Sequence, residues 1–144
     1  MKKKIYPVMM AMTLSLSMTV QSFAAGWVEL SDGWYWLDDS DNKIKESWHQ
    51  DTDGTWYYLG ADGMMQTGWK LDPAGNLYYL NPNKGDPMGS MVAGWKLINN
   101  TWYFFNTIHD GTYGKVLTGW QWIDGYCYYF DSTGKMLFDV VTPD

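Results

Sequence analysis

The chain has 144 residues, the length of a single domain, and 46% of them are hydrophobic. It is acidic, with a formal net charge of −6, and contains no arginine and no basic stripe that could release counterions from phosphates, which excludes nucleic acid as a partner. Ten tryptophans and eleven tyrosines stand against five phenylalanines. Because tryptophan and tyrosine carry polar edges, we expect many of these rings to stay partly exposed and to bind a ligand, and the acidic charge favours a cationic one.

Residues 1–24 have the pattern of a secretory signal peptide. Three lysines precede an apolar run at about 8–20, and the small residues Ser22 and Ala24 match the positions that a signal peptidase reads. A membrane anchor is the alternative, but the apolar run is too short and too rich in Thr and Ser to span a bilayer. We therefore expect a secreted protein that begins at Ala25, has no transmembrane segment and carries a net charge of −9.

The rest of the chain, residues 25–144, consists of five copies of one unit. A tryptophan opens each copy, at Trp27, Trp48, Trp69, Trp95 and Trp120. The spacings of 21, 21, 26 and 25 residues are typical of repeats in which each copy is one supersecondary unit. The copies run over residues 26–47, 48–67, 68–93, 94–118 and 119–144.

Each copy predicts a β-hairpin followed by a connector. The second strand is an aromatic run at residues 34–37, 56–59, 77–80, 102–105 and 127–130. A turn signal precedes each run, at Asp32-Gly33, Asp53-Gly54, Ala74-Gly75, Asn99-Asn100 and Asp124-Gly125. Copies three and four carry extra loops at 81–87 and 107–113. Because a lone hairpin is only marginally stable in water, the predicted fold is an all-β solenoid of stacked β-hairpins.

The combination of Gly-Trp, a Trp-Tyr-Tyr run, Asp-Gly-x-Met and Thr-Gly-Trp resembles the choline-binding, or cell-wall-binding, repeat of Gram-positive surface proteins. The resemblance covers nearly all of residues 25–144. Glucan-binding repeats of glucosyltransferases and the repetitive oligopeptides of clostridial toxins look similar, and residues 119–130 lean toward the toxin style. The resemblance implies a non-catalytic module, without a cofactor, that recognises choline on teichoic or lipoteichoic acid as part of a secreted, cell-wall-associated protein.

The resemblance also implies where choline would bind. A quaternary ammonium group has no hydrogen to donate, so proteins surround it with the negative faces of aromatic rings. In the family, two tryptophans of one repeat and the last aromatic of the next Trp-Tyr-Tyr run form the walls, with the connector methionine nearby. By position, the sites are Trp27, Trp34 and Tyr58; Trp48, Trp56 and Tyr79 with Met65; and Trp95, Trp102 and Tyr129. Trp69, Leu77 and Phe104 form a weak or degenerate site, because Leu77 removes a wall. The first copy has Ile44 where methionine is usual.

The remaining polar residues are interpreted as structural. His49 and His109 are interpreted as loop or surface histidines, since no serine, cysteine or carboxylate accompanies them in a triad order. The acidic residues at 38–41 lack the glycine and terminal glutamate of a calcium loop, so we expect a solvated turn and no metal site. Cys127 is the only cysteine and occupies a strand position that usually holds tryptophan, which indicates an apolar substitution.

Two alternatives to choline binding remain open. A glycan-binding module would use the same rings as stacking platforms, with Gln50, Asn76 and Gln121 as planar amide partners beside them. A structural solenoid without a small ligand would use the rings only to stack one hairpin on the next.

Overall fold

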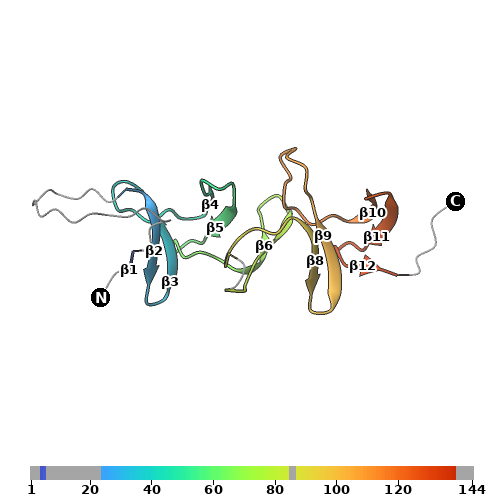
Figure 1. The fold of residues 1–144 in the computed structure, drawn as a ribbon, viewed down its shortest axis with the longest axis horizontal. Coiled ribbons are helices and arrows are strands. Elements are labelled where there is room, and N and C mark those ends of the chain that lie inside the picture. The colour runs from blue at the N-terminus through green and yellow to red at the C-terminus, as the bar shows by residue number, and fades with distance from the viewer. Residues whose placement is uncertain (1–3, 6–23, 85–86, 139–144) are drawn as a thin grey trace, which may run out of the picture. The chain divides into compact units, whose positions relative to one another are not determined.

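The computed structural model describes residues 4–5, 24–84 and 87–138 (Figure 1). The predicted signal peptide therefore lies almost entirely outside the described residues. The described part is all-β and consists of successive hairpins, as the sequence predicted. No helix in it is long and apolar enough to cross a bilayer.

Five antiparallel hairpins follow one another along the chain. They are β2 (Gly26–Leu30) with β3 (Gly33–Leu37), β4 (Ser47–Gln50) with β5 (Trp56–Leu59), β6 (Gly68–Leu71) with β7 (Leu77–Leu80), β8 (Gly94–Ile98) with β9 (Thr101–Phe105), and β10 (Gly119–Ile123) with β11 (Tyr126–Phe130). Two short strands extend the first and the last of these hairpins. They are β1 (Lys4–Ile5), which pairs with β2, and β12 (Met136–Leu137), which pairs with β11.

The hairpin turns follow the local sequence closely. Two-residue turns close the last two hairpins, with φ values of 47° and 61° at Asn99-Asn100 and of 52° and 84° at Asp124-Gly125. Positive φ at both positions is the type I′ geometry that matches strand twist, and Asn, Asp and Gly tolerate it best. The first hairpin turns at Ser31-Asp32, one residue earlier than predicted, because Gly33 already pairs with Leu30.

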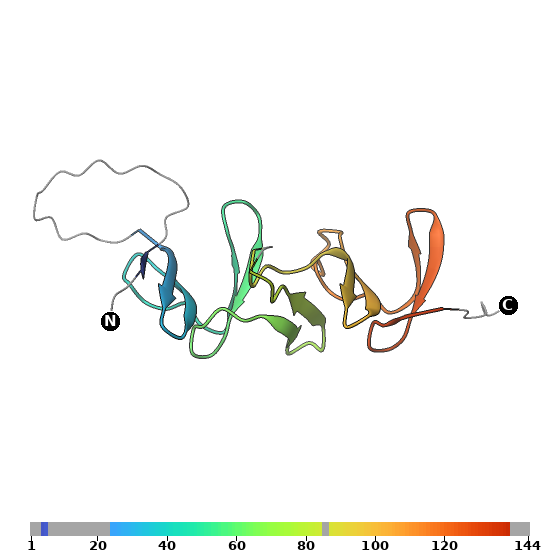
Figure 2. The ribbon, with the colours of Figure 1, turned by 60° about the horizontal axis from the view of Figure 1, so that its bottom comes forward.

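The chain divides into two compact units, residues 1–66 and 67–144. In each unit, the connector after the second hairpin bonds both to its own hairpin and to the preceding one. The hairpins and connectors can be followed by colour in Figure 2. The backbone N–H of Met65 donates to the carbonyl of Trp34 at 2.7 Å, and that of Val116 donates to the carbonyl of Leu77 at 2.8 Å. These hydrogen bonds hold neighbouring hairpins together even where no strand pairs with the next.

The cores of both units are built from tyrosine, phenylalanine and aliphatic side chains. On β5 the inward Tyr57 and Leu59 are buried, while Trp56 and Tyr58 are partly exposed, as expected of a strand whose successive side chains point to opposite faces. The other buried apolar side chains are Val28, Tyr35, Leu37, Tyr78, Leu80, Ile98, Tyr103, Phe104, Phe105, Val116, Ile123 and Phe130. All ten tryptophans lie in the described residues, and each keeps part of its side chain exposed. The tryptophans are thus available at the surface.

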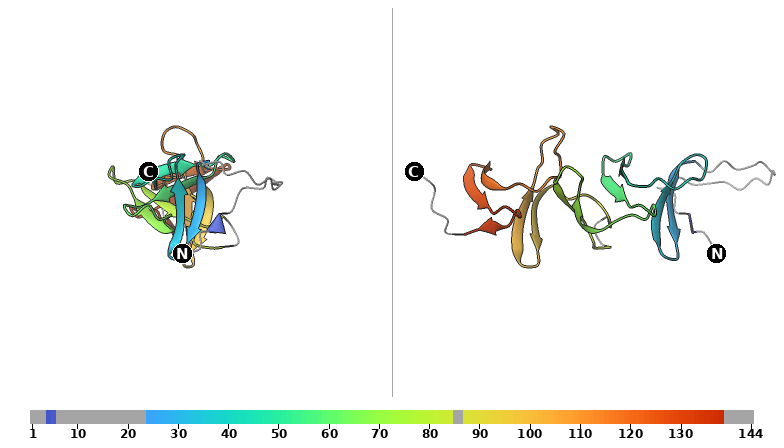
Figure 3. Two further views of the ribbon diagram at one scale, coloured as in Figure 1. Left: turned by 90° about the vertical axis from the view of Figure 1, so that its left-hand side faces the viewer. Right: turned by 180° about the vertical axis from the view of Figure 1, so that it is seen from behind.

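The extra residues of the fourth copy form a loop that projects beyond the β8–β9 hairpin (Figure 3). The buried side chain of Asn106 organises this loop. Its amide nitrogen donates to Asp110 at 3.1 Å and to Thr112 at 2.8 Å, and its amide oxygen accepts the backbone N–H of Ile108 at 3.0 Å.

Candidate functional site

One face of every hairpin carries aromatic rings around the opening tryptophan, and we call it the outer face. The register places each of these tryptophans directly opposite another ring: Trp27 and Trp36, Trp48 and Tyr58, Trp69 and Tyr79, Trp95 and Phe104, Trp120 and Tyr129. The ring centroids in these pairs are 5.4, 5.2, 4.9, 5.0 and 5.0 Å apart. Because every second residue of a strand shares a face, Trp34, Trp56, Leu77 and Trp102 lie on the same outer faces.

The fullest cluster of rings lies between the fourth and fifth hairpins. The ring of Trp95 lies 6.1 Å from that of Trp102, at an angle of 89°, and 4.8 Å from that of Tyr128 in the fifth hairpin, at 73°. Phe104 and Phe130 close the cluster on the buried side. Trp102 keeps 40% of its surface exposed. Steeply inclined rings with an open side can present several π faces to one small cation.

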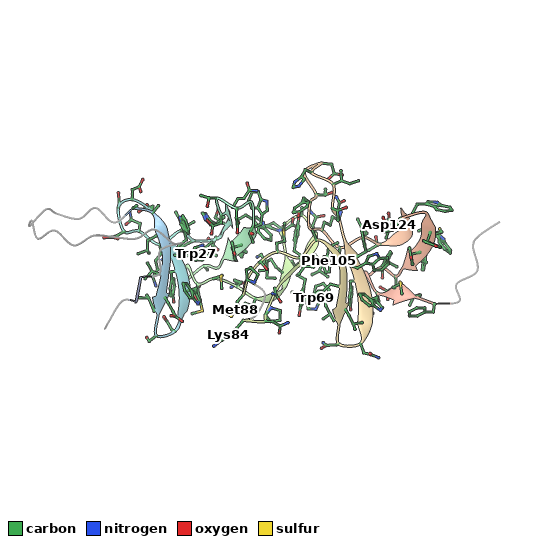
Figure 4. All side chains as sticks on the ribbon, in the orientation of Figure 1. Trp27, Trp69, Lys84, Met88, Phe105 and Asp124 are labelled. Carbon is green, nitrogen blue, oxygen red and sulfur yellow. The ribbon has the colours of Figure 1, made fainter. Side chains whose placement is uncertain are left out.

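A smaller cluster surrounds Trp69, between the third and fourth hairpins. Trp69 lies 5.0 Å from Tyr103 and 6.0 Å from Phe105, centroid to centroid (Figure 4). Leu77 occupies the place that Trp102 has in the fourth hairpin, and it packs against the core instead of adding a ring. Its cross-strand partner Leu71 is exposed. This cluster therefore has one ring fewer than the cluster around Trp95.

The cluster between the first and second hairpins contains an imidazole. The ring of Trp27 lies 4.9 Å from Tyr57 at 70° and 5.7 Å from His49 at 84° (Figure 4). The imidazole of His49 stacks on Trp36 at 3.8 Å. The indole N–H of Trp27 donates to the carboxylate of Asp51 at 3.0 Å. Polar groups thus enter this cluster from the second hairpin.

The ring that the next hairpin contributes is one residue earlier than the sequence predicted. Tyr57 contacts Trp27, and Tyr128 contacts Trp95. The predicted Tyr58 and Tyr129 lie opposite the opening tryptophans of their own hairpins. Adjacent strand residues point to opposite faces, and it is the inner, core-forming face of each hairpin that meets the rings of the preceding one. The alternation of side chains along a strand, which puts Tyr57 and Tyr58 on opposite faces, was the signal in the sequence that could have identified Tyr57 and Tyr128.

The predicted trio of Trp48, Trp56 and Tyr79 draws on both units. Trp48 and Trp56 share the outer face of the β4–β5 hairpin in the first unit, whereas Tyr79 belongs to the second unit, where it pairs with Trp69. Met65 lies in the connector of the first unit. This trio stays a prediction from the sequence.

The connector position of the first copy is occupied by Lys43, not by Ile44. The backbone of Lys43 forms an antiparallel β-bridge with Leu37 of its own hairpin, as that of Met65 does with Leu59 of the second hairpin. The ammonium group of Lys43 lies 3.4 Å from the ring centroid of Tyr35. The first copy thus replaces a thioether with an internal cation–π contact.

The two histidines differ in their surroundings. His109 lies on the exposed loop of the fourth copy and stacks on Tyr113 at 4.1 Å, as expected of a loop histidine. The same interpretation is wrong for His49, which is a partly buried residue of β4 in contact with Trp27 and Trp36. Burial lowers the pKa of His49, against a smaller opposing effect of Asp51.

The acidic turn at residues 38–41 and the cysteine at position 127 are not part of the aromatic clusters around Trp27, Trp69 and Trp95. The carboxylate of Asp38 accepts the backbone N–H groups of Asn42 at 2.8 Å and Ser40 at 2.9 Å, and these bonds lower the pKa of Asp38. Cys127 is exposed, opposite Trp122 on the outer face of the last hairpin. No three His, Cys, Asp or Glu side chains come together as a possible metal site within the described ranges.

Family models match most of the chain. A choline-binding repeat model matches residues 47–91 and 117–142, and a cell wall binding repeat model matches residues 25–40 and 93–107. No curated protein matches the sequence.

Solved structures with the same fold support this assignment. Choline binding protein F from Streptococcus pneumoniae is 30% identical, with a TM-score of 0.67 over 84% of this chain and 40% of that one. A pneumococcal cell wall endolysin from phage Cp-1, solved in complex with choline, is 26% identical, with a TM-score of 0.59 over 84% of this chain and 33% of that one. This chain therefore spans less than half the length of these relatives. It belongs to the choline-binding, or cell wall binding, repeat family.

Proposed function

We propose that the chain is a non-catalytic module of a secreted protein that attaches to the cell wall by binding choline groups of teichoic or lipoteichoic acid. The observation that carries this proposal is the cluster of Trp95, Trp102 and Tyr128, whose steeply inclined rings leave Trp102 40% exposed. The choline found with the related endolysin supports the same ligand class.

The chemistry of the cluster suits a trimethylammonium group better than other cations. Such a group has no N–H to donate, so it gains nothing from a hydrogen-bonding carboxylate and is held by the π faces of several rings. A primary ammonium group would lose hydrogen bonds to water on entering the same cluster. The net negative charge of the chain adds a general attraction for cations.

The clusters are proposed to differ in strength. We call a set of rings that would surround one choline group a box. Trp95, Trp102 and Tyr128 form the box with the highest expected affinity for choline, and Trp27, Trp34 and Tyr57 form another. In the first two of these clusters, Tyr128 and Tyr57 take the place that the sequence gave to Tyr129 and Tyr58. The trio of Trp48, Trp56 and Tyr79 with Met65 is retained from the sequence. The cluster of Trp69 and Leu77 is proposed to be weak, and the ring that the next hairpin adds to it is Tyr103 and not the predicted Phe104.

Attachment would depend on several sites acting together. If each ring face contributes about 0.5–2 kcal/mol, a single box binds choline with roughly millimolar affinity. Linked sites on one polymer raise the apparent affinity by about 10²–10⁴ without a new contact. A repeat module is therefore suited to a polymer that carries many choline groups.

The glycan alternative has less support in the side chains. The amide of Gln50 donates to the carbonyl of Gly54, that of Asn76 to Asp72, and that of Gln121 to the carbonyl of Thr118. These three amides, which a sugar would need beside the rings, are engaged within their own hairpins.

The test is retention of the secreted chain on a quaternary-amine resin. We expect retention in high salt and elution by free choline, because the rings and not the net charge hold the resin group. Ethanolamine at the same concentration is the control, since it has the same hydroxyethyl tail without the methyl groups. Elution by salt alone would contradict the proposal, and retention on dextran with indifference to choline would support the glycan alternative.

A further inference from the structure

The junction between the first two hairpins contains a titratable ring where the junctions of the second unit contain phenylalanine. In the second unit, Phe105 packs 6.4 Å from Tyr79 and 6.0 Å from Trp69, and Phe130 packs 5.9 Å from Trp95. Both phenylalanines are fully buried. Each supplies a ring to the outer face of the hairpin before it.

The second hairpin has Leu59 at the position of these phenylalanines, and Leu59 is also fully buried. Leucine is smaller and has no ring, so a space remains beside the outer face of the first hairpin. His49 fills it from the neighbouring strand, since His49 and Leu59 lie on the same face of the β4–β5 hairpin. Its imidazole stacks on Trp36 at 3.8 Å and meets Trp27 edge-on at 5.7 Å. The imidazole thus does the packing that phenylalanine does elsewhere.

The surroundings of His49 favour its neutral form. Its Nε2 atom is buried and has no hydrogen-bond partner. Of the ionisable groups around it, Asp51 favours the charged form, but its carboxylate already accepts the indole N–H of Trp27. Tyr57, the cross-strand neighbour, has a pKa raised above 10.0 by burial and stays neutral, and Glu29 lies across the outer face of the first hairpin, opposite Trp34. A proton on Nε2 would place an unsatisfied charged donor among rings.

We propose that His49 makes this junction acid-sensitive: protonation loosens the packing of the β2–β3 hairpin on the β4–β5 hairpin, while the junctions built on Phe105 and Phe130 keep their packing. Because burial lowers the pKa of His49, its contribution to stability is complete above the ordinary value of 6.5 and is lost as the pH falls from 6.5 through the pKa of the folded state. If the proposed choline function holds, acid would also remove the box around Trp27 and leave the one around Trp95.

The first measurement is an NMR titration of the two histidines together with amide hydrogen exchange at pH 7.5 and 5.0. We expect His49 to titrate below 6.5 and the protection factors of β2 and β3 to fall in acid, about tenfold for each pH unit by which the pKa of His49 lies below 6.5. Protection in β8 and β9 should change little. An ordinary or raised pKa of His49, or an equal loss of protection in both units, would overturn the proposal.

Two variants separate the cause. His49→Phe introduces the ring that the other junctions use and should remove the pH dependence of β2 and β3, whereas His109→Gln removes the only other histidine and should leave it intact. Persistence of the effect in His49→Phe, or its loss in His109→Gln, contradicts the assignment to His49. If His49→Phe fails to fold, the titration of His49 in the unaltered chain still decides. None of these readouts involves choline, so a failure of the binding proposal leaves this test unaffected.

Discussion

Truncation of Trp102 separates ligand binding from folding more cleanly than truncation of Trp95 does. Its 40% exposure means that Trp102→Ala removes a side chain that is only partly packed, whereas Trp95 touches Trp102, Phe104, Tyr128 and Phe130. Complete loss of a buried tryptophan costs about 3–5 kcal/mol, so we expect a loss of about 2 kcal/mol in the free energy of unfolding. Loss of one ring face, at about 0.5–2 kcal/mol, should weaken choline binding in this box about 2- to 30-fold.

Isothermal titration with choline measures this change, and urea unfolding measures stability in the same samples. From a roughly millimolar site, the expected weakening removes one choline equivalent from the titration, and binding to choline-bearing polymer should fall more steeply because the sites act together. Trp122→Ala is the matched control, since Trp122 is 78% exposed on the last hairpin and belongs to none of the proposed boxes. Retention of every equivalent by Trp102→Ala would refute the reasoning, as would an equally large loss in Trp69→Ala.

Three further outcomes follow from the packing. Phe105→Ala should lower the free energy of unfolding in urea by about 3–5 kcal/mol, because the side chain is fully buried. Phe138 is 73% exposed, so Phe138→Ala should change it by no more than about 0.5 kcal/mol, and similar losses in the two variants would contradict the assigned core. Gly134→Ala should be more destabilising than Gly125→Ala by about 1–3 kcal/mol, because the added Cβ would overlap the side chain of Val116 only at Gly134, whereas both glycines have the same φ of 84°. Equal melting temperatures of the two variants would argue against that contact. Leu77→Trp should add a choline equivalent in titration, because it restores the missing wall beside Trp69, and an unchanged count would show that Leu77 does not limit that cluster.

The local sequence was sufficient for the hairpins. The aromatic runs gave the second strands, and Asn99-Asn100 and Asp124-Gly125 gave type I′ turns in their predicted places, because positive φ at both turn positions is a property of the residues themselves. The absence of a ring at Leu77 also follows from residue type alone, while the weakness of a choline site beside it stays a prediction.

The misplaced connector residue of the first copy came from a single extra residue between that connector and Trp48. Glu46, with φ of 46°, takes the left-handed position that Gly68 takes in the next copy with φ of 80°, so Ser47 is inserted before Trp48. Counting back from Trp48 therefore reaches Ile44, whereas the β-bridge to Leu37 places Lys43 at the connector position. A spacing read along the chain does not reveal it, because the hydrogen bonds that define the position come from another strand.

The sequence by itself determined the all-β class, the five hairpins, all but the first of their turns and the family, because each depends on residue type and spacing within one copy. The tertiary structure decided which rings meet, since contact between hairpins depends on which face of a strand turns toward its neighbour. That is why Tyr57 and Tyr128, rather than Tyr58 and Tyr129, contact the preceding tryptophans. It is also why the partial burial of His49 could not be predicted from its own copy, since Trp36, on which its imidazole stacks, belongs to the preceding hairpin.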